Sequence, residues 1–369
     1  MNIGVSARWL LKNKSTGTGL FVQEVVSNLI TQHQKHHFFL FFEEPCSLTF
    51  PGHVKAVVLP PAAINPLLWK YWFDIKIPRA LKKYKIDILL NFDGCVSLQT
   101  KVPQFLLIHG FQFDRSFTWH KLSQRIFYKL YLPQLLRKAT LLFVTTPFIQ
   151  EQLINQYKLS PAKIRVVYTG LPEIFRPCEP EVRTGVKEAF ADGKEYFLIR
   201  QAVATPLLIN LLKGFSLFKK RQRSNWKLLV SQQTSTSNMQ LKKLLPTYKY
   251  RDDIVFTGMV DAAEEAKIVG SAYAVVCFST PGDSANLLEV FQCAVPCLVP
   301  AGERLPDTDN AAVLSFDPAN PTDIADKLMQ IYKDESLRTV LAQKAINTAA
   351  LYTWQRTAGL IWDGIEDSL

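Results

Sequence analysis

The sequence predicts an α/β fold with two Rossmann-like domains, each a parallel sheet covered by helices. The chain has 369 residues, which is long for one core and suits two domains of about 150 to 190 residues. Short apolar strands alternate with helical segments in both halves of the chain. A proline-containing segment, Leu171 to Pro180, separates the two halves and is typical of an interdomain linker.

The first half is expected to open with a strand over Asn2 to Val5, a loop over Lys12 to Gly19 and a helix over Leu20 to Gln32. Gly17 and Gly19 lie where the loop meets the helix, and glycine there allows the backbone to approach a ligand closely. The remaining elements of this half are expected as strands at His37–Phe42, His53–Leu59, Ile86–Asn91, Gln104–Ile108 and Leu141–Val144, with a helix at Leu122–Arg137.

His109 directly follows the strand that is expected to end at Ile108. Ligands of open α/β sheets bind beyond the carboxyl ends of the strands, so His109 is well placed for a catalytic role. A structural histidine is the alternative interpretation.

The second half is expected to contain strands at Tyr196–Ile199, Trp226–Val230, Tyr273–Phe278 and Cys297–Val299, a strand followed by a loop over Asp253–Val260, and helices that begin near Asn210 and Asn286. Glu289 lies one turn inside the second of these helices. A carboxylate there can accept hydrogen bonds from sugar hydroxyls beside a phosphate held at the helix N-terminus. A solvent-exposed helical glutamate is the alternative.

The stretch Phe278 to Pro300 resembles the donor-sugar motif of family-4 glycosyltransferases, whose frame is kept by Leu288-Glu289-Val290, Cys293 and Pro296. Ile164 to Gly170 is similar to the segment that closes the first domain of that family, and Thr353 to Ile365 to its terminal helix. The resemblance implies the GT-B fold, in which two Rossmann-like domains face each other across a cleft. It places the domains at 1–175 and 176–345, with 346–369 carrying a helix back to the first domain.

The resemblance also implies roles for individual residues. His109 would be catalytic, and Arg8 and Thr146 would lie on the acceptor side. The residues implied on the donor side are Gly17, Gly19, Arg200, Met259, Leu287, Leu288 and Glu289. The resemblance implies no metal and no cofactor, and the nucleotide-sugar enters as substrate. The Asp307-Thr308-Asp309 run lies in a loop where the family has no metal, so it is not expected to bind one.

The sequence departs from the family pattern on the donor side. Thr205 and Pro206 replace an Arg-Lys pair, Pro281 replaces the first glutamate of the sugar motif, and Arg200 replaces a glycine. A hydrogen bond to a charged group contributes about 1.5–3 kcal/mol, so loss of the Arg-Lys pair predicts weak binding of the donor diphosphate.

Two functions remain open at this point. One is transfer of a hexose from a nucleotide-sugar to a glycan or lipid-linked acceptor. The other is a catalytically inactive relative that binds acceptor or partners an active transferase.

The chain carries 43 Lys and Arg against 32 Asp and Glu, for a net charge of +11, which favours anionic partners. No zinc finger, helix-turn-helix or RNA-binding motif indicates nucleic acid. The segment Pro66 to Lys85 mixes basic residues with Trp69, Tyr71 and Trp72, so it is either an interfacial helix on anionic lipid or a core helix with a basic outer face.

Six cysteines without paired spacing, the lack of an apolar run near 18 residues and the lack of a signal-peptide pattern predict a cytoplasmic protein. A lipid-linked acceptor would place it at the inner face of the membrane.

Overall fold

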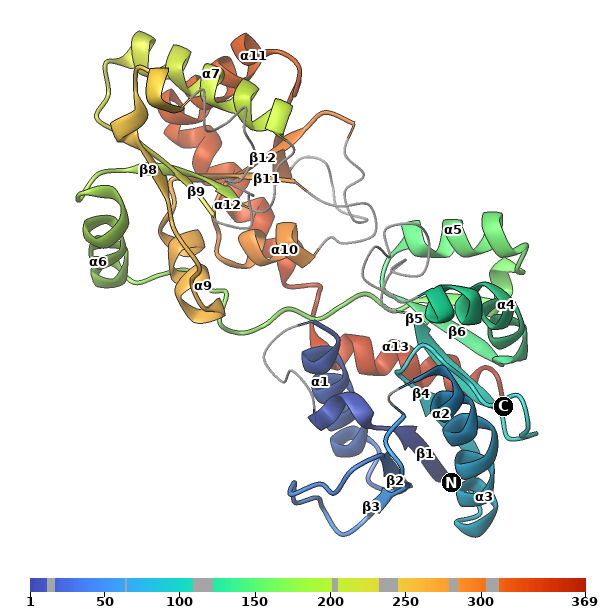
Figure 1. The fold of residues 1–369 in the computed structure, drawn as a ribbon. Coiled ribbons are helices and arrows are strands. Elements are labelled where there is room, and N and C mark those ends of the chain that lie inside the picture. The colour runs from blue at the N-terminus through green and yellow to red at the C-terminus, as the bar shows by residue number, and fades with distance from the viewer. Residues whose placement is uncertain are drawn as a thin grey trace. The chain divides into compact units, whose positions relative to one another are not determined.

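The computed structural model divides the chain into two compact units (Figure 1). Unit 1 contains Met1–Gly170 and Thr353–Leu369, and unit 2 contains Leu171–Tyr352. The structure describes residues 1–11, 17–63, 65–108, 122–200, 205–231, 245–278, 285–302 and 312–369. Two parallel-sheet, Rossmann-like units confirm the predicted fold class, and the cleft between them stays a prediction.

Unit 1 is built on a seven-stranded parallel sheet with the order β3-β2-β1-β4-β5-β6-β7. Its strands are β1 (Asn2–Ser6), β2 (His37–Phe42), β3 (Val54–Val58), β4 (Ile88–Asn91), β5 (Gln104–Ile108), β6 (Leu141–Val144) and β7 (Ile164–Val166). Its helices are α1 (Gly17–Gln32), α2 (Pro66–Tyr71), α3 (Ile77–Lys83), α4 (Leu122–Lys138), α5 (Pro147–Tyr157) and α13 (Trp354–Glu366), with the 3-10 turns η1 (Arg8–Leu11) and η3 (Pro161–Lys163) and the π-helical segment η2 (Trp72–Lys76). The strand order reverses between β1 and β4. The carboxyl ends of these two strands, called here the β1–β4 edge, are therefore the topological switch point of unit 1.

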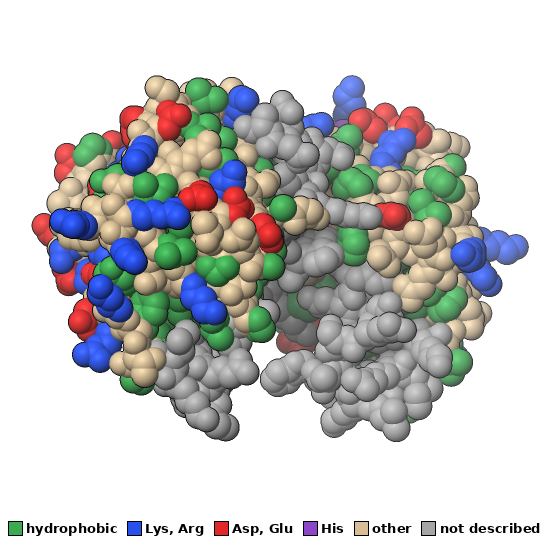
Figure 2. Space-filling model, turned by 90° about the horizontal axis from the view of Figure 1, so that it is seen from above, with side chains coloured by type: hydrophobic (Ala, Val, Ile, Leu, Met, Phe, Trp, Pro, Cys, Tyr) green, Lys and Arg blue, Asp and Glu red, His purple; other side chains and the backbone are tan. Residues whose placement is uncertain are grey.

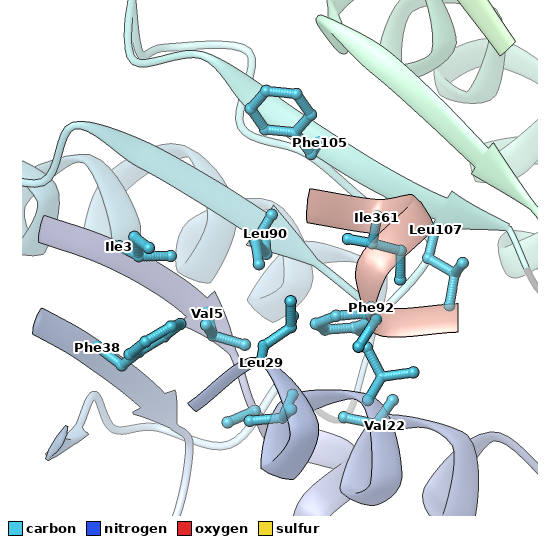
Figure 3. Close-up of a cluster of buried hydrophobic side chains, with 14 of the residues drawn as sticks. Ile3, Val5, Val22, Leu29, Phe38, Leu90, Phe92, Phe105, Leu107 and Ile361 are labelled. Atoms are coloured by element: carbon cyan, nitrogen blue, oxygen red, sulfur yellow. The ribbon is translucent and has the colours of Figure 1, made fainter. Parts of the chain in front are cut away.

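Helices cover both faces of this sheet, which is why its strands are continuous apolar runs. One face packs against α1 and α13, and Figure 3 shows Val22 and Leu29 of α1 and Ile361 of α13 packed against side chains of the sheet. The other face packs against η2, α3, α4 and α5.

Unit 2 is built on a six-stranded parallel sheet with the order β10-β9-β8-β11-β12-β13. Its strands are β8 (Tyr196–Arg200), β9 (Lys227–Val230), β10 (Ile254–Phe256), β11 (Ala274–Cys277), β12 (Cys297–Pro300) and β13 (Val313–Phe316). Its helices are α6 (Pro180–Ala191), α7 (Thr205–Gln222), α9 (Ala262–Ser271), α10 (Ala285–Gln292), α11 (Pro321–Lys333) and α12 (Glu335–Ala349), with the 3-10 turns η4 (Leu245–Thr247) and η5 (Arg251–Asp253). The order reverses between β8 and β11.

Some boundaries differ from the sequence prediction for local reasons. Helix α1 begins at Gly17 rather than at Leu20, and α7 begins at Thr205 rather than near Asn210. Pro206 lies in the first turn of α7, where its missing N–H breaks no helical hydrogen bond. In the stretch Asp253 to Val260, which is expected from the sequence to hold a strand and a loop, the strand ends at Phe256, and Gly258 in the loop takes a positive φ of 76°.

The terminal helix α13 belongs to unit 1, as the sequence predicts. The ring of Trp354 makes an edge contact with Phe21 of α1, with 5.7 Å between ring centroids. Trp362 stacks on His33 with 3.7 Å between centroids. Thr353 caps the helix by accepting a hydrogen bond from the Arg356 N–H. Residues from both ends of the chain therefore complete one core.

Two glycines of α13 provide a test of this docking. A Cβ added to Gly364 would lie 2.7 Å from Cε1 of Phe143 on β6, whereas a Cβ added to Gly359 meets no atom within 4 Å. We expect Gly364→Ala to lower the free energy of unfolding by about 1–3 kcal/mol, because the helix must move away from the sheet. Gly359→Ala is the matched control and should raise that free energy by about 0.5–1 kcal/mol, because alanine favours the helix. Urea denaturation measures both changes, and equal effects of the two variants would contradict the docking.

Candidate functional site at the strand ends

Arg200 lies at the switch point of unit 2. It is the last residue of β8 and pairs in register with Cys277, the last residue of β11. Only 2 % of the residue is exposed. A guanidinium remains charged in proteins, so a buried arginine at this position must be paired.

Two carboxylates and one carbonyl surround this guanidinium. Nε of Arg200 donates to Oε1 of Glu265 at 3.0 Å, and Nη2 donates to Oε2 of Glu289 at 2.5 Å. Nη1 donates to the carbonyl oxygen of Asn286 at 2.7 Å. The guanidinium carbon also lies 4.9 Å from the ring centroid of Phe175. Arg200 thus joins β8 to the linker, to α9 and to α10.

The surroundings of Arg200 act on its charge in opposite directions. Burial by itself lowers the pKa of the guanidinium, but the carboxylates of Glu289 and Glu265 outweigh burial and raise it. The cation is therefore a permanent part of unit 2. Its hydrogen bonds hold Glu289, whose side chain is 15 % exposed, in the middle of α10.

The other described donor-side residues differ in what they can offer a ligand. Leu287 and Leu288 are buried, so their side chains pack in the core and only their backbone could contact a donor. Met259 lies after β10 with 96 % of its surface exposed. Gly17 and Gly19 belong to the first turn of α1, where Gly17 has a φ of +60° and Gly19 is buried.

On the acceptor side, Arg8 and Thr146 both have structural partners. Nε of Arg8 donates to Oε2 of Glu43 at 2.9 Å, and Nη2 of Arg8 donates to the carbonyl oxygen of Ala63. The guanidinium lies over the rings of Trp69 and Trp72, 5.2 and 5.5 Å from their centroids. The hydroxyl of Thr146 caps α5 by accepting from the Ile149 N–H. Their acceptor-side roles stay predictions.

Some predicted positions lie outside the described residues. These are His109, Pro281 and the Asp307-Thr308-Asp309 run, and the side chain of Thr205 is not described either. Among the residues that the structure does describe, no group of three or more His, Cys, Asp or Glu side chains could hold a metal ion.

The structure also reveals polar residues at the switch point of unit 1 that the sequence analysis did not select. Ser6 ends β1 and pairs in register with Asn91, which ends β4. The hydroxyl of Ser6 donates to Oδ2 of Asp93. Gly94 follows with a φ of +67°, which favours glycine and turns the chain after Asp93. The signal in the sequence was the run Asn91-Phe92-Asp93-Gly94 at the end of a buried strand.

Two protein families match the chain. The model of glycosyltransferase family 4 matches residues 16–173, and the model of glycosyl transferases group 1 matches residues 186–348. No curated protein matches the sequence.

Several solved structures share the fold. A glycosyltransferase from Rickettsia africae has a TM-score of 0.65 at 14% identity, covering 100% of this chain and 97% of that one. WaaG, a glycosyltransferase involved in lipopolysaccharide biosynthesis, has a TM-score of 0.63 at 14% identity, covering 98% and 99%. HepE from Anabaena in complex with UDP-glucose has a TM-score of 0.66 at 11% identity, covering 100% of both chains.

The ion pairs of Arg200 lead to a prediction about stability. Arg200→Met leaves Glu265 and Glu289 without their cation, so we expect it to lower the free energy of unfolding by about 3–5 kcal/mol. Arg221→Met is the matched control, because Arg221 also pairs at 2.5 Å, with Asp326, but both side chains are exposed. Loss of an exposed pair should change that free energy by about 0–1 kcal/mol. Urea denaturation of both variants decides the matter, and similar losses would show that Arg200 does not organise this edge.

Proposed function

The chain belongs to the GT-B glycosyltransferases of the family 4 and group 1 type, and from this premise we propose that it transfers a hexose from a nucleotide-sugar to a glycan or lipid-linked acceptor. The observation that supports the proposal is the position of Glu289. Arg200 holds this carboxylate in the middle of α10, beside the switch point of unit 2. A carboxylate at a strand–helix edge is the group that accepts hydrogen bonds from sugar hydroxyls in dinucleotide folds.

A nucleotide-sugar as donor also agrees with the relative HepE, which has been solved with UDP-glucose. In the proposed reaction Glu289 orients the donor, and His109, which follows the last residue of β5 in the sequence, acts at the reacting sugar. Arg8 and Thr146 lie on the acceptor side. Departure of the diphosphate requires positive charge, which a GT-B site supplies from a helix N-terminus and from cations.

The geometry of Arg200 favours a second candidate function. Three of its nitrogens donate to groups of unit 2 itself. The cation at this position is therefore engaged in internal ion pairs, and Thr205 and Pro206 supply no other. With the Arg-Lys pair replaced and Arg200 engaged internally, this second function is a protein that binds donor weakly and acts as an inactive partner or acceptor-binding protein.

The proposed lipid-linked acceptor is supported by one flank of unit 1. The exposed basic residues of the α2–α3 run and its end are Lys70, Arg79, Lys82, Lys83 and Lys85. Leu67 on the same run is 82% exposed and Ile75 is 38% exposed, whereas Trp72 is fully buried and Trp69 is half-buried. On the face shown in Figure 2, by contrast, basic side chains are interspersed with acidic and hydrophobic ones.

Exposed apolar and basic side chains on one helical run are the pattern of an interfacial segment. No helix within the described part of the chain has the length and hydrophobicity to cross a bilayer. The proposal therefore includes peripheral binding to anionic lipid at the cytoplasmic face of a membrane, through the flank of α2 and α3.

Calorimetry with UDP-, GDP-, ADP- and dTDP-hexoses tests the donor side. We expect one of them to bind with a dissociation constant of about 1 mM or weaker, because the diphosphate lacks its Arg-Lys pair. Restoring the family residues in Thr205→Arg, Pro206→Lys and Pro281→Glu together should strengthen this binding by roughly two to four orders of magnitude. If the restored variant binds a donor that the unmodified chain neither binds nor turns over, the inactive relative is the correct function.

Vesicle flotation tests the membrane face. Binding to vesicles that contain anionic lipid should weaken with salt and weaken in Lys82→Glu with Lys83→Glu, at about 1 kcal/mol per basic residue near the surface. Lys213→Glu with Lys220→Glu changes the same charge at exposed positions of α7 in unit 2 and should leave binding unchanged. Binding that ignores lipid charge, or equal effects of the two variants, would rule out this face.

A further inference from the structure

The switch point of unit 1 presents polar side chains on one face of the sheet. Side chains alternate along a strand, and Ile3, Val5, Leu90 and Phe92 point to the α1 and α13 side (Figure 3). The neighbours Ser6 and Asn91 therefore point to the opposite face. Gly4 supports this assignment, because a Cβ added there would contact Phe41 and Leu89 of the second core.

Asn91 is in an unusual state for a buried amide. Only 1 % of the residue is exposed, and neither its nitrogen nor its oxygen has a hydrogen-bond partner among the described residues. A buried polar group without a partner destabilises the fold, because it has given up its bonds to water. Such groups are rare in native proteins and are found where strain or function retains them.

The loop that carries Asp93 is held in place on several sides. Asp93 accepts from the hydroxyl of Ser6. Further along the loop, the Leu98 N–H donates to Oδ1 of Asp74 in η2 at 2.8 Å. Ser97 exchanges two hydrogen bonds with the side-chain amide of Gln104, at 2.8 and 2.7 Å. The positions of Asn91 and Asp93 are thus fixed before any ligand arrives, which is the arrangement expected of a binding site.

The chemistry of these groups selects the ligand. The Asn91 side chain offers N–H donors and a carbonyl acceptor, and the Asp93 carboxylate accepts. Neighbouring sugar hydroxyls, each a donor and an acceptor, match this set. A phosphate does not, because the carboxylate repels it.

We infer that Asn91, Asp93 and Ser6 form a subsite that binds two neighbouring hydroxyl groups of the sugar acceptor at the β1–β4 edge. This inference rests on the proposed function in one respect, namely that the chain takes a glycan or sugar-containing acceptor. It assigns the neutral sugar to unit 1 and leaves the charged donor to unit 2.

The test combines sugar binding with stability, because a site residue and a structural residue differ in both. Asn91→Leu keeps the number and branching of the side-chain atoms but removes the buried polar group. We expect it to raise the melting temperature of the ligand-free protein by about 2–4 °C. In saturation-transfer NMR without nucleotide, methyl glucoside, galactoside and mannoside are the probes. We expect one of them to contact the unmodified protein and to bind roughly tenfold more weakly or worse to Asn91→Leu.

Gln104→Leu is the matched control, since Gln104 is an equally buried residue of unit 1. The oxygen and the nitrogen of its side-chain amide are both hydrogen-bonded to the backbone of Ser97. It should lower the melting temperature and keep the sugar contact. Asn91→Ala, which cannot overpack the site, should lose the sugar contact as Asn91→Leu does. Sugar contact that survives both Asn91 variants, or no contact with any of the three glycosides, overturns the inference.

The inference and the proposed function can fail separately. Asn91-dependent sugar binding in a protein that binds no nucleotide-sugar removes the transfer reaction and leaves the subsite. Nucleotide-sugar binding without Asn91-dependent sugar binding removes the subsite and leaves the donor function.

Discussion

A cation buried at the end of β8 is the constraint on which the edge of unit 2 depends. Taking a guanidinium out of water is unfavourable unless carboxylates and carbonyls replace the lost hydration. Arg200 meets this requirement with Glu265 from α9, Glu289 and the Asn286 carbonyl from α10, and the ring of Phe175 from the linker. One side chain thereby fixes two helices and the linker against the sheet. The orientation of Glu289, the residue proposed to orient the donor, is a consequence of that pairing.

The two switch points differ in how their buried polar side chains are hydrogen-bonded. Both lie where the strand order reverses. The register-paired strand ends are Ser6 and Asn91 in unit 1, and Arg200 and Cys277 in unit 2. In unit 2 the polar groups of Arg200 are bonded within the unit. In unit 1 the amide of Asn91 has no hydrogen-bond partner among the described residues. An edge that is already bonded favours stability, whereas an unbonded amide held in place favours a ligand, and proteins commonly give up stability at such sites.

The sequence predicts the layers of this fold well, because parallel strands covered on both faces leave a continuous apolar signal, as in His37–Phe42 and Leu141–Val144. The sequence predicts the first residues of the helices less well. A glycine or proline in a first turn is compatible with both a loop and a helix, as at Gly17 and Pro206. The partners of Arg200 could not be predicted from the sequence. Arg200 and Glu289 are 89 residues apart, and only the packing of α10 against the sheet brings them together. The same is true of Ser6 and Asp93, which are 87 residues apart.

The position of unit 2 within the chain adds a constraint on unit 1. Unit 2 is inserted between Gly170 and Thr353, and the two crossings lie together, because the Leu171 N–H donates to the carbonyl oxygen of Tyr352 at 3.2 Å. Trp354, Ile361 and Ile365 then complete the core that also contains Val5 and Phe92. Phe92 lies between Asn91 and Asp93, so its burial under α13 helps to fix the strand end that carries both polar residues. The arrangement of the unit 1 switch point therefore depends on α13, a helix that follows the whole of unit 2 in the sequence.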